Sequence, residues 1–197
     1  MITKQRIVKI ALNELLNKGT HWISIQNIAE LIHINEGKLL DIFPIGDHEL
    51  LMDAVEYAGK TWVQEIKKDI DRKDNVTEKL KILIKEYALG SKDYPKSLDI
   101  YIDLWKIIKD SKDEYIKGRL KELYIFYASE FTSILQTFGE SHLLQGEVDA
   151  FSLIVTILSD VIHIQSITLE NELDFDMISN VLEKIISALF LESNAKI

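Results

Sequence analysis

The chain has 197 residues, no cysteine and a formal net charge of −9 at pH 7. This length is enough to bury the core of one large domain or two small ones. The absence of cysteine excludes disulfides and thiolate metal sites. The N-terminal stretch is amphipathic rather than signal-like, and the longest uncharged apolar run, Ala150 to Ser159, falls short of the roughly 20 residues that span a bilayer. We therefore expect a cytoplasmic protein.

The acidic character is confined to the later part of the chain. Residues 1–48 contain five basic and five acidic side chains, so the whole net charge lies beyond them. The most basic stretch is the start, where Lys4, Arg6 and Lys9 lie within six positions. This distribution excludes a generally basic nucleic-acid binder and leaves room for a small DNA-binding region at the N-terminus.

Apolar periodicity predicts an all-α fold of about nine helices, because no segment alternates with the period of two that a strand requires. Gly19 is a natural stop for the first helix, and Ser24 and Asn35 are candidate N-caps of the next two. Asn75 with Glu78 has the spacing of a capping box. The expected helices cover residues 3–18, 25–33, 35–43, 47–71, 75–90, 95 onward, 111–138, 147–170 and 174–192.

The second and third helices are short and are joined by a tight turn, His33 to Asn35, which predicts a helix-turn-helix. In this motif the second helix enters the major groove of DNA and presents its N-terminal residues to base edges. The long helices begin after this motif. We therefore expect a DNA-binding domain over residues 1–46 and a ligand-binding and dimerisation domain over residues 47–197.

The stretch from Arg6 to Val55 resembles the N-terminal domain of the TetR family of bacterial transcriptional regulators. The residues that carry the resemblance are Ile7, Ala11, Gly19, Ser24, Ile28, Ala29, Ile34, Asn35, Gly37, Leu39, Phe43, Pro44, Leu50 and Leu51. The resemblance implies a homodimer held by the last two helices. It also implies a ligand pocket between the fourth and seventh helices, whose occupancy changes the spacing of the two DNA-binding heads.

The sequence departs from the family pattern at positions that contact DNA. Leu40 stands where the family usually has tyrosine, and Glu36 where it usually has a basic or small polar residue. After Phe43-Pro44 the family usually places a lysine that grips phosphate, whereas this chain has Ile45, Gly46 and Asp47 and one extra residue before Leu50. Since neutralised phosphates supply much of the affinity for DNA, these changes predict weaker binding.

The candidate DNA contacts are the remaining polar and basic residues of the motif and its flanks. Two belong to an expected N-terminal arm, and the others lie at the starts of the second, third and fourth helices. They are Lys4, Arg6, Ser24, Gln26, Asn35, Gly37, Lys38 and His48.

The last two helices are apolar over more of their circumference than a surface helix requires, which favours a homodimeric four-helix bundle over a buried monomer helix. The expected interface residues are Phe151, Val155, Leu158, Ile162, Val181, Ile185 and Leu189. Aromatic residues of the fourth to seventh helices suit a small hydrophobic or aromatic effector. The candidate ligand contacts are Trp62, Tyr87, Tyr101, Trp105, Tyr124 and Tyr127.

No catalytic motif, metal-ligand spacing or cofactor fingerprint is present, so we expect neither an enzyme nor a bound cofactor or metal. The sequence predicts a ligand-responsive repressor that binds a palindromic operator as a homodimer. The alternative is a TetR-fold dimeric binding protein for a small apolar ligand or a protein partner that does not read DNA. Trp22 and the Phe43–Gly46 stretch are also similar to ubiquinone-biosynthesis accessory proteins, but their later tryptophan-rich part has no counterpart here.

Overall fold

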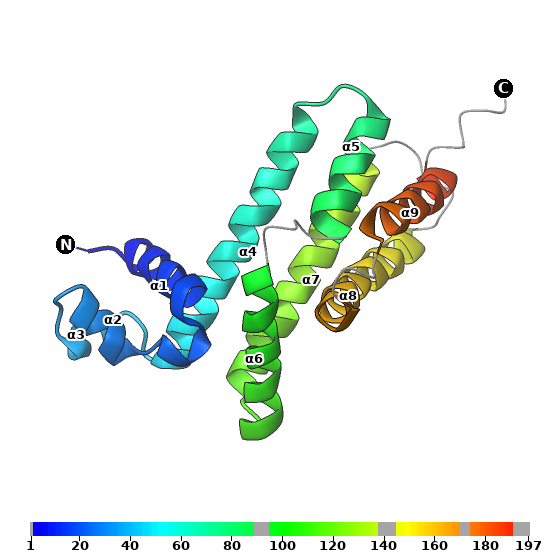
Figure 1. Cartoon of the computed structure of the whole chain (residues 1–197). Coiled ribbons are helices and arrows are strands. Elements are labelled where there is room, and N and C mark those ends of the chain that lie inside the picture. Colours follow the sequence, from blue (N-terminus) through cyan, green and yellow to red (C-terminus); the bar gives the residue numbers. More distant parts are fainter. Residues whose placement is uncertain (1, 89–94, 138–144, 170–173, 191–197) are drawn as a thin grey trace. The chain divides into compact units, whose positions relative to one another are not determined.

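The computed structural model describes residues 2–88, 95–137, 145–169 and 174–190, and these residues are helical with no strand among them (Figure 1). The predicted all-α fold is thereby confirmed, with nine α-helices in this part of the chain and two further helical segments. The elements are α1 (Lys4–Lys18), η1 (Thr20–Trp22), α2 (Ile25–Leu31), α3 (Glu36–Leu40), α4 (Asp47–Asp71), α5 (Val76–Ile82), η2 (Leu83–Ala88), α6 (Pro95–Ser111), α7 (Glu114–Gln136), α8 (Gln145–Leu169) and α9 (Phe175–Phe190).

Three helices differ most from the sequence prediction. The third helix ends at Leu40, and the chain continues in turns as far as Phe43, whose N–H still bonds to the Leu39 carbonyl. The fifth passes at Ile82 into the π-helical segment η2, where the prediction had a single α-helix. The seventh begins after Asp113, because the Asp113 carboxylate accepts a hydrogen bond from the Ile116 N–H at 2.8 Å.

The predicted N-caps are confirmed. Ser24 Oγ accepts from the Asn27 N–H at 3.1 Å, and Asn35 Oδ1 accepts from the Gly37 N–H at 2.8 Å. Asn75 caps α5 in the same way. Its expected capping-box partner, Glu78, instead forms an ion pair with Lys73 at 3.6 Å. Each cap satisfies one of the N–H groups that the first turn of a helix leaves without an intrahelical acceptor.

Contacts divide the chain into two compact units. Unit 1 comprises Met1–Thr61 and Pro95–Leu123, and unit 2 comprises Trp62–Tyr94 and Tyr124–Ile197. Helices α4 and α7 each contribute to both units. The predicted division after residue 46 separates the chain by expected function, whereas these two units separate it by packing. In unit 1, helices α1, α2 and α3 belong together with the start of α4, with α6 and with the start of α7.

The core of unit 1 is built from the apolar stripes that the sequence periodicity indicates. Leu39 and Phe43, four residues apart, are fully buried, and so are the stripe residues of α1 and α2 that face them across the small head. The fully or nearly fully buried residues of this core include Ile7, Ala11, Leu15, Ile28, Ala29, Leu39, Phe43, Leu50 and Ala54.

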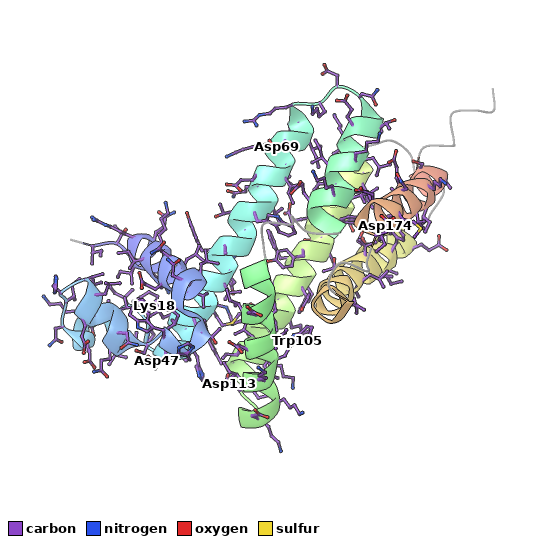
Figure 2. All side chains as sticks on the ribbon, viewed as in Figure 1. Lys18, Asp47, Asp69, Trp105, Asp113 and Asp174 are labelled. Carbon is purple, nitrogen blue, oxygen red and sulfur yellow. The ribbon has the colours of Figure 1, made fainter. Side chains whose placement is uncertain are left out.

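The start of α4 is fastened to the start of α2 by Asp47 (labelled in Figure 2). Its Oδ1 atom accepts a hydrogen bond from the Ile25 N–H at 2.7 Å, so that Ser24 and Asp47 together satisfy two N–H groups of the first turn of α2. Gly46 precedes α4 with φ at 79°, a left-handed backbone conformation that favours glycine. The turn therefore directs the Asp47 carboxylate toward the N-terminus of α2.

The core of unit 2 joins α5, η2, α7, α8 and α9. The π-helical segment η2 contacts both α8 and α9, and its residues Leu83 and Ile84 are fully buried. Between α7 and α8, the buried hydroxyl of Thr132 donates to Ser152 Oγ at 2.7 Å. Ser152 in turn donates to the Val148 carbonyl, so the polar groups in this core are hydrogen-bonded.

Helices α8 and α9 each leave an apolar stripe exposed. On α8, Leu153, Ile154, Ile157, Leu158 and Val161 are between 43% and 54% exposed. These positions recur at the spacing of one helix face, and apolar residues in such a continuous stripe mark an interaction surface rather than scattered exposure. On α9 the corresponding residues are Met177, Val181 and Ile185, at 60%, 50% and 43% exposed.

Of the seven residues expected at a dimer interface, Leu158, Val181 and Ile185 lie on these exposed stripes. Val155 is only 2% exposed and packs into the core of its own unit, so a charge placed there tests the fold of the subunit. Phe151 is half-buried. The side chains of Ile162 and Leu189 lie outside the described residues.

We predict that Asp47→Ala lowers the free energy of unfolding by about 0.5–2 kcal/mol, because it leaves the Ile25 N–H at the start of α2 without its acceptor. Urea unfolding followed by circular dichroism measures the change. Asp41→Ala is the matched control: it removes an exposed carboxylate from the same head and is expected to change the stability by less than about 0.5 kcal/mol. Equal effects of the two substitutions would contradict the role assigned to Asp47.

Candidate nucleic-acid interface

Helices α2 and α3 form the helix-turn-helix that the sequence predicts. The two helices contact each other, and the turn between them is closed by a hydrogen bond from the Ile34 N–H to the Ala29 carbonyl at 3.0 Å. His33 takes φ at 55° in this turn, a left-handed conformation that ends α2. The chain can therefore reverse within three residues and begin α3 at the Asn35 cap.

The start of α3 is exposed. Glu36, Gly37 and Lys38 follow the Asn35 cap, and all three are solvent-accessible. In the part of the chain that the structure describes, Lys38 forms no ion pair. Leu40 is 45% exposed, although the buried side of this short helix is filled by Leu39. This surface offers DNA one cation, one carboxylate and an apolar side chain.

Lys4 and Arg6 lie in the first turn of α1, within the expected first helix, and not in a separate N-terminal arm. The helix begins at Lys4 because Thr3 caps it, accepting from the Arg6 N–H at 3.3 Å. The Lys4 ammonium is 2.8 Å from Asp53 Oδ2 and 3.0 Å from Glu49 Oε1. Arg6 is exposed and forms no ion pair within the described residues.

Three other predicted DNA contacts have partners within the chain. Ser24 is used as the N-cap of α2, and Gln26 donates from Nε2 to Glu30 Oε1 at 3.1 Å. His48 Nδ1 lies 2.5 Å from Asp113 Oδ2, a contact that joins the start of α4 to the residue before α7. Of the candidate cations, only Arg6 and Lys38 are thus exposed without an ion pair in the residues described.

Carboxylates of α4 are bound to two groups that attract anions, the N-terminus of α2 and the Lys4 ammonium. Asp47 accepts from the N-terminus of α2, whose N–H groups attract anions, while Glu49 and Asp53 hold Lys4. Partial burial lowers the pKa of Lys4, but its hydrogen bonds to Asp53 and Glu49 outweigh this and raise the pKa overall. Lys4 is therefore fully charged at neutral pH and already paired.

Arg119 on α7 completes this charged cluster and is a residue that sequence reasoning missed. Its Nε atom is 2.5 Å from Glu56 Oε1, and its terminal nitrogen is 2.8 Å from Asp53 Oδ1. The hydrogen bond to Glu56, followed by that to Asp53, raises the pKa of Arg119. The partners are separated by 63 and 66 positions in the chain, and no local pattern in the sequence signals the pairing.

The candidate ligand residues are divided between the two units. Tyr101 and Trp105 lie four residues apart on α6 in unit 1. In unit 2, the Trp62 ring meets the Tyr127 ring edge-on, with centroids 5.9 Å apart, and Tyr124 lies one turn before Tyr127 on α7. Tyr127 is buried and Trp62 is half-buried. The side chain of Tyr87 lies outside the described residues.

No helix that the structure describes is long and apolar enough to cross a membrane. No group of three or more histidine, aspartate or glutamate side chains in the described ranges is arranged to hold a metal ion.

Comparison with known proteins finds similarity in structure and none in sequence families. No family model matches the chain, and no curated protein matches it significantly. A protein from Pseudomonas aeruginosa PAO1 assigned as a transcriptional regulator has a TM-score of 0.65 at 15% identity, covering 99% of this chain and 94% of that one.

Two ligand-bound structures are also similar. A protein from Saccharomonospora viridis assigned as a transcriptional regulator, in complex with choline, has a TM-score of 0.59 at 18% identity over 96% of this chain and 95% of that one. The transcriptional regulator FadR from Bacillus subtilis, in complex with stearoyl-CoA, has a TM-score of 0.57 at 14% identity over 93% and 97%. From its helix-turn-helix to α9, the chain therefore has the TetR-type fold of transcriptional regulators.

Proposed function

We propose that the protein is a ligand-responsive transcriptional repressor that binds a palindromic operator as a homodimer. The observation that carries this proposal is the helix-turn-helix: α3 is capped at Asn35 and offers Gly37 and Lys38 to solvent. The start of a recognition helix is the part that reads base edges in the major groove. The likeness to regulators along nearly the whole chain supports the same function.

In this proposal Lys38 reads a base or holds a phosphate, while Arg6 holds a phosphate from the start of α1. Asn35, Gly37, Ser24, Gln26 and His48 line the same region. The head supplies few unpaired cations, and each neutralised phosphate contributes about 0.9 to the slope of log affinity against log salt. With one or two phosphates neutralised by Arg6 and Lys38, we therefore expect a slope of roughly −1 to −2 for each head, shallower than for a strongly basic repressor.

The homodimer in this proposal is held by the exposed stripes of α8 and α9. A helix face with so many accessible apolar residues is stabilised when a second copy covers it, and two helices from each subunit make a four-helix bundle. The effector is a small hydrophobic or aromatic molecule, for which the aromatic cluster of Trp62, Tyr124 and Tyr127 supplies the contacts. Effector binding changes the separation of the heads from the roughly 34–36 Å between successive major grooves.

One observation favours a second candidate function, a TetR-fold dimeric binding protein that does not read DNA. Asp47, Glu49 and Asp53 place carboxylates on the N-terminus of α2 and on Lys4. A phosphate has to displace these acids or tolerate their charge. In this alternative the fold is kept for a small apolar ligand or a protein partner.

Binding to a genomic fragment library separates the two functions. The retained DNA is sequenced after washing at about 50 mM and about 150 mM salt. Retention of one palindromic site, with an affinity that falls as salt rises, is the result expected for the repressor. Weak retention of all fragments at low salt and of none at physiological salt would overturn it in favour of the second function.

We predict that Lys38→Ala weakens binding to the retained operator by roughly 1–3 kcal/mol if Lys38 contacts a base, and changes the preference at that base. Fluorescence anisotropy with operator DNA and with single-base variants measures both effects. Lys60→Ala, which removes a lysine from α4 outside the head, is the control and leaves the affinity unchanged. Equal operator affinities for Lys38→Ala and the wild type would remove Lys38 from the interface.

We predict that Ile157→Glu and Val181→Glu each convert the dimer to a monomer of 22.7 kDa, because each places a charge on an exposed stripe of α8 or α9. Sedimentation velocity measures the change. Ile125→Glu is the matched control, since Ile125 is 55% exposed but lies on α7. If Ile157→Glu and Val181→Glu both sediment as dimers, the interface lies elsewhere.

A further inference from the structure

Asp53 lies between two cations that come from different helices. Its Oδ2 atom is 2.8 Å from the Lys4 ammonium of α1, and its Oδ1 atom is 2.8 Å from the Arg119 guanidinium of α7. The Asp53 side chain is only 14% exposed, so the two pairs are screened less than surface ion pairs. A single carboxylate of α4 thus joins the start of α1 to α7.

The two cations differ in how much they depend on Asp53. Arg119 is also held by Glu56 at 2.5 Å and donates to the Tyr115 hydroxyl. Lys4 has Glu49 at 3.0 Å as its one further carboxylate among the described residues. Removal of the Asp53 charge therefore leaves Arg119 well anchored and loosens Lys4.

Lys4 is also the cation of this cluster that is accessible to a large ligand. Its side chain is 47% exposed, against 22% for Arg119. It lies in the first turn of α1, close in the chain to the exposed Arg6, in the most basic stretch of the sequence. A DNA phosphate that approaches the start of α1 competes with Asp53 and Glu49 for the same ammonium.

We propose that Asp53 is a positioning residue that sets the DNA affinity of the head by holding Lys4 back from phosphate. This inference rests on the DNA-binding function proposed above. Arg119 shares the carboxylate, so the Arg119 pair reduces the charge with which Asp53 holds Lys4. A separation of Arg119 from Asp53 strengthens that hold and weakens DNA binding.

The test is Asp53→Asn in the full chain, measured with operator DNA retained from the library. The expected result is a gain of affinity of about threefold to tenfold for each head, and a salt slope steeper by about 0.9 for each Lys4 that reaches a phosphate. General damage to the fold lowers affinity, so a gain together with a steeper slope is specific to the released lysine.

Glu56→Gln is the matched control. It removes the same charge from α4, one turn further along, and it takes a partner from Arg119 but none from Lys4. Its affinity is expected to stay within about twofold of the wild type. Adding Lys4→Gln to Asp53→Asn is expected to cancel the gain. An Asp53→Asn affinity equal to or below that of Glu56→Gln would overturn the inference.

A second measurement does not depend on DNA. Urea unfolding of the wild type, Lys4→Gln, Asp53→Asn and the double variant forms a double-mutant cycle. The double variant is expected to lose less stability than the sum of the losses in the two single variants. Additive losses would mean that the pair contributes nothing in solution and would overturn the inference by itself. If the wild type retains the operator but Asp53→Asn gains no affinity, this inference fails alone. If no variant retains any site at physiological salt, the proposed repressor function fails and the inference fails with it.

Discussion

The first turns of α4 carry the interactions on which the arrangement of unit 1 depends. Asp47 holds the start of α2, Glu49 holds the start of α1, and Asp53 and Glu56 hold α7 through Arg119. All of these partners are donors or cations, so the acidic side chains of one helix orient three other helices. The apolar core drives the packing, but it is non-directional, and these polar contacts fix where each helix begins.

The acidic side chains of α4 stabilise the fold by occupying cations and N–H groups that nucleic-acid binding would use. A DNA-binding head gains affinity from free cations and unoccupied N–H groups, and this head uses several of them internally. Of the cations predicted to contact DNA, Lys38 on α3 and Arg6 on α1 are the ones that remain exposed without an ion pair in the described residues. In the proposed function, DNA binding therefore depends less on the phosphate backbone and more on the few residues at the start of α3.

Local features of the fold were predictable from sequence because they depend on neighbouring residues. The caps at Ser24 and Asn35, the stop at Gly19 and the burial of Leu39 and Phe43 all follow from spacing and residue type. The charged cluster did not follow, because Arg119 meets Asp53 across 66 positions and no periodicity encodes that pair. The burial of Val155 was missed for another reason: a helix that is apolar on several sides does not reveal which side its own subunit covers.

The π-helical segment η2 has a consequence for how this chain is aligned with others. A π-turn holds more residues than an α-turn, so the chain absorbs extra length inside the helix that begins at Val76 instead of in a loop. Each additional residue rotates everything after it by roughly 100° relative to the stripe that α5 established. Leu83 and Ile84 lie three and four residues after the buried Leu80, the spacing of one helix face, and they enter the core of unit 2, where η2 contacts α8 and α9. An alignment that carries the period of α5 through the whole of η2 without a gap therefore loses the helical phase at the end of η2, and structural superposition has to set the register there.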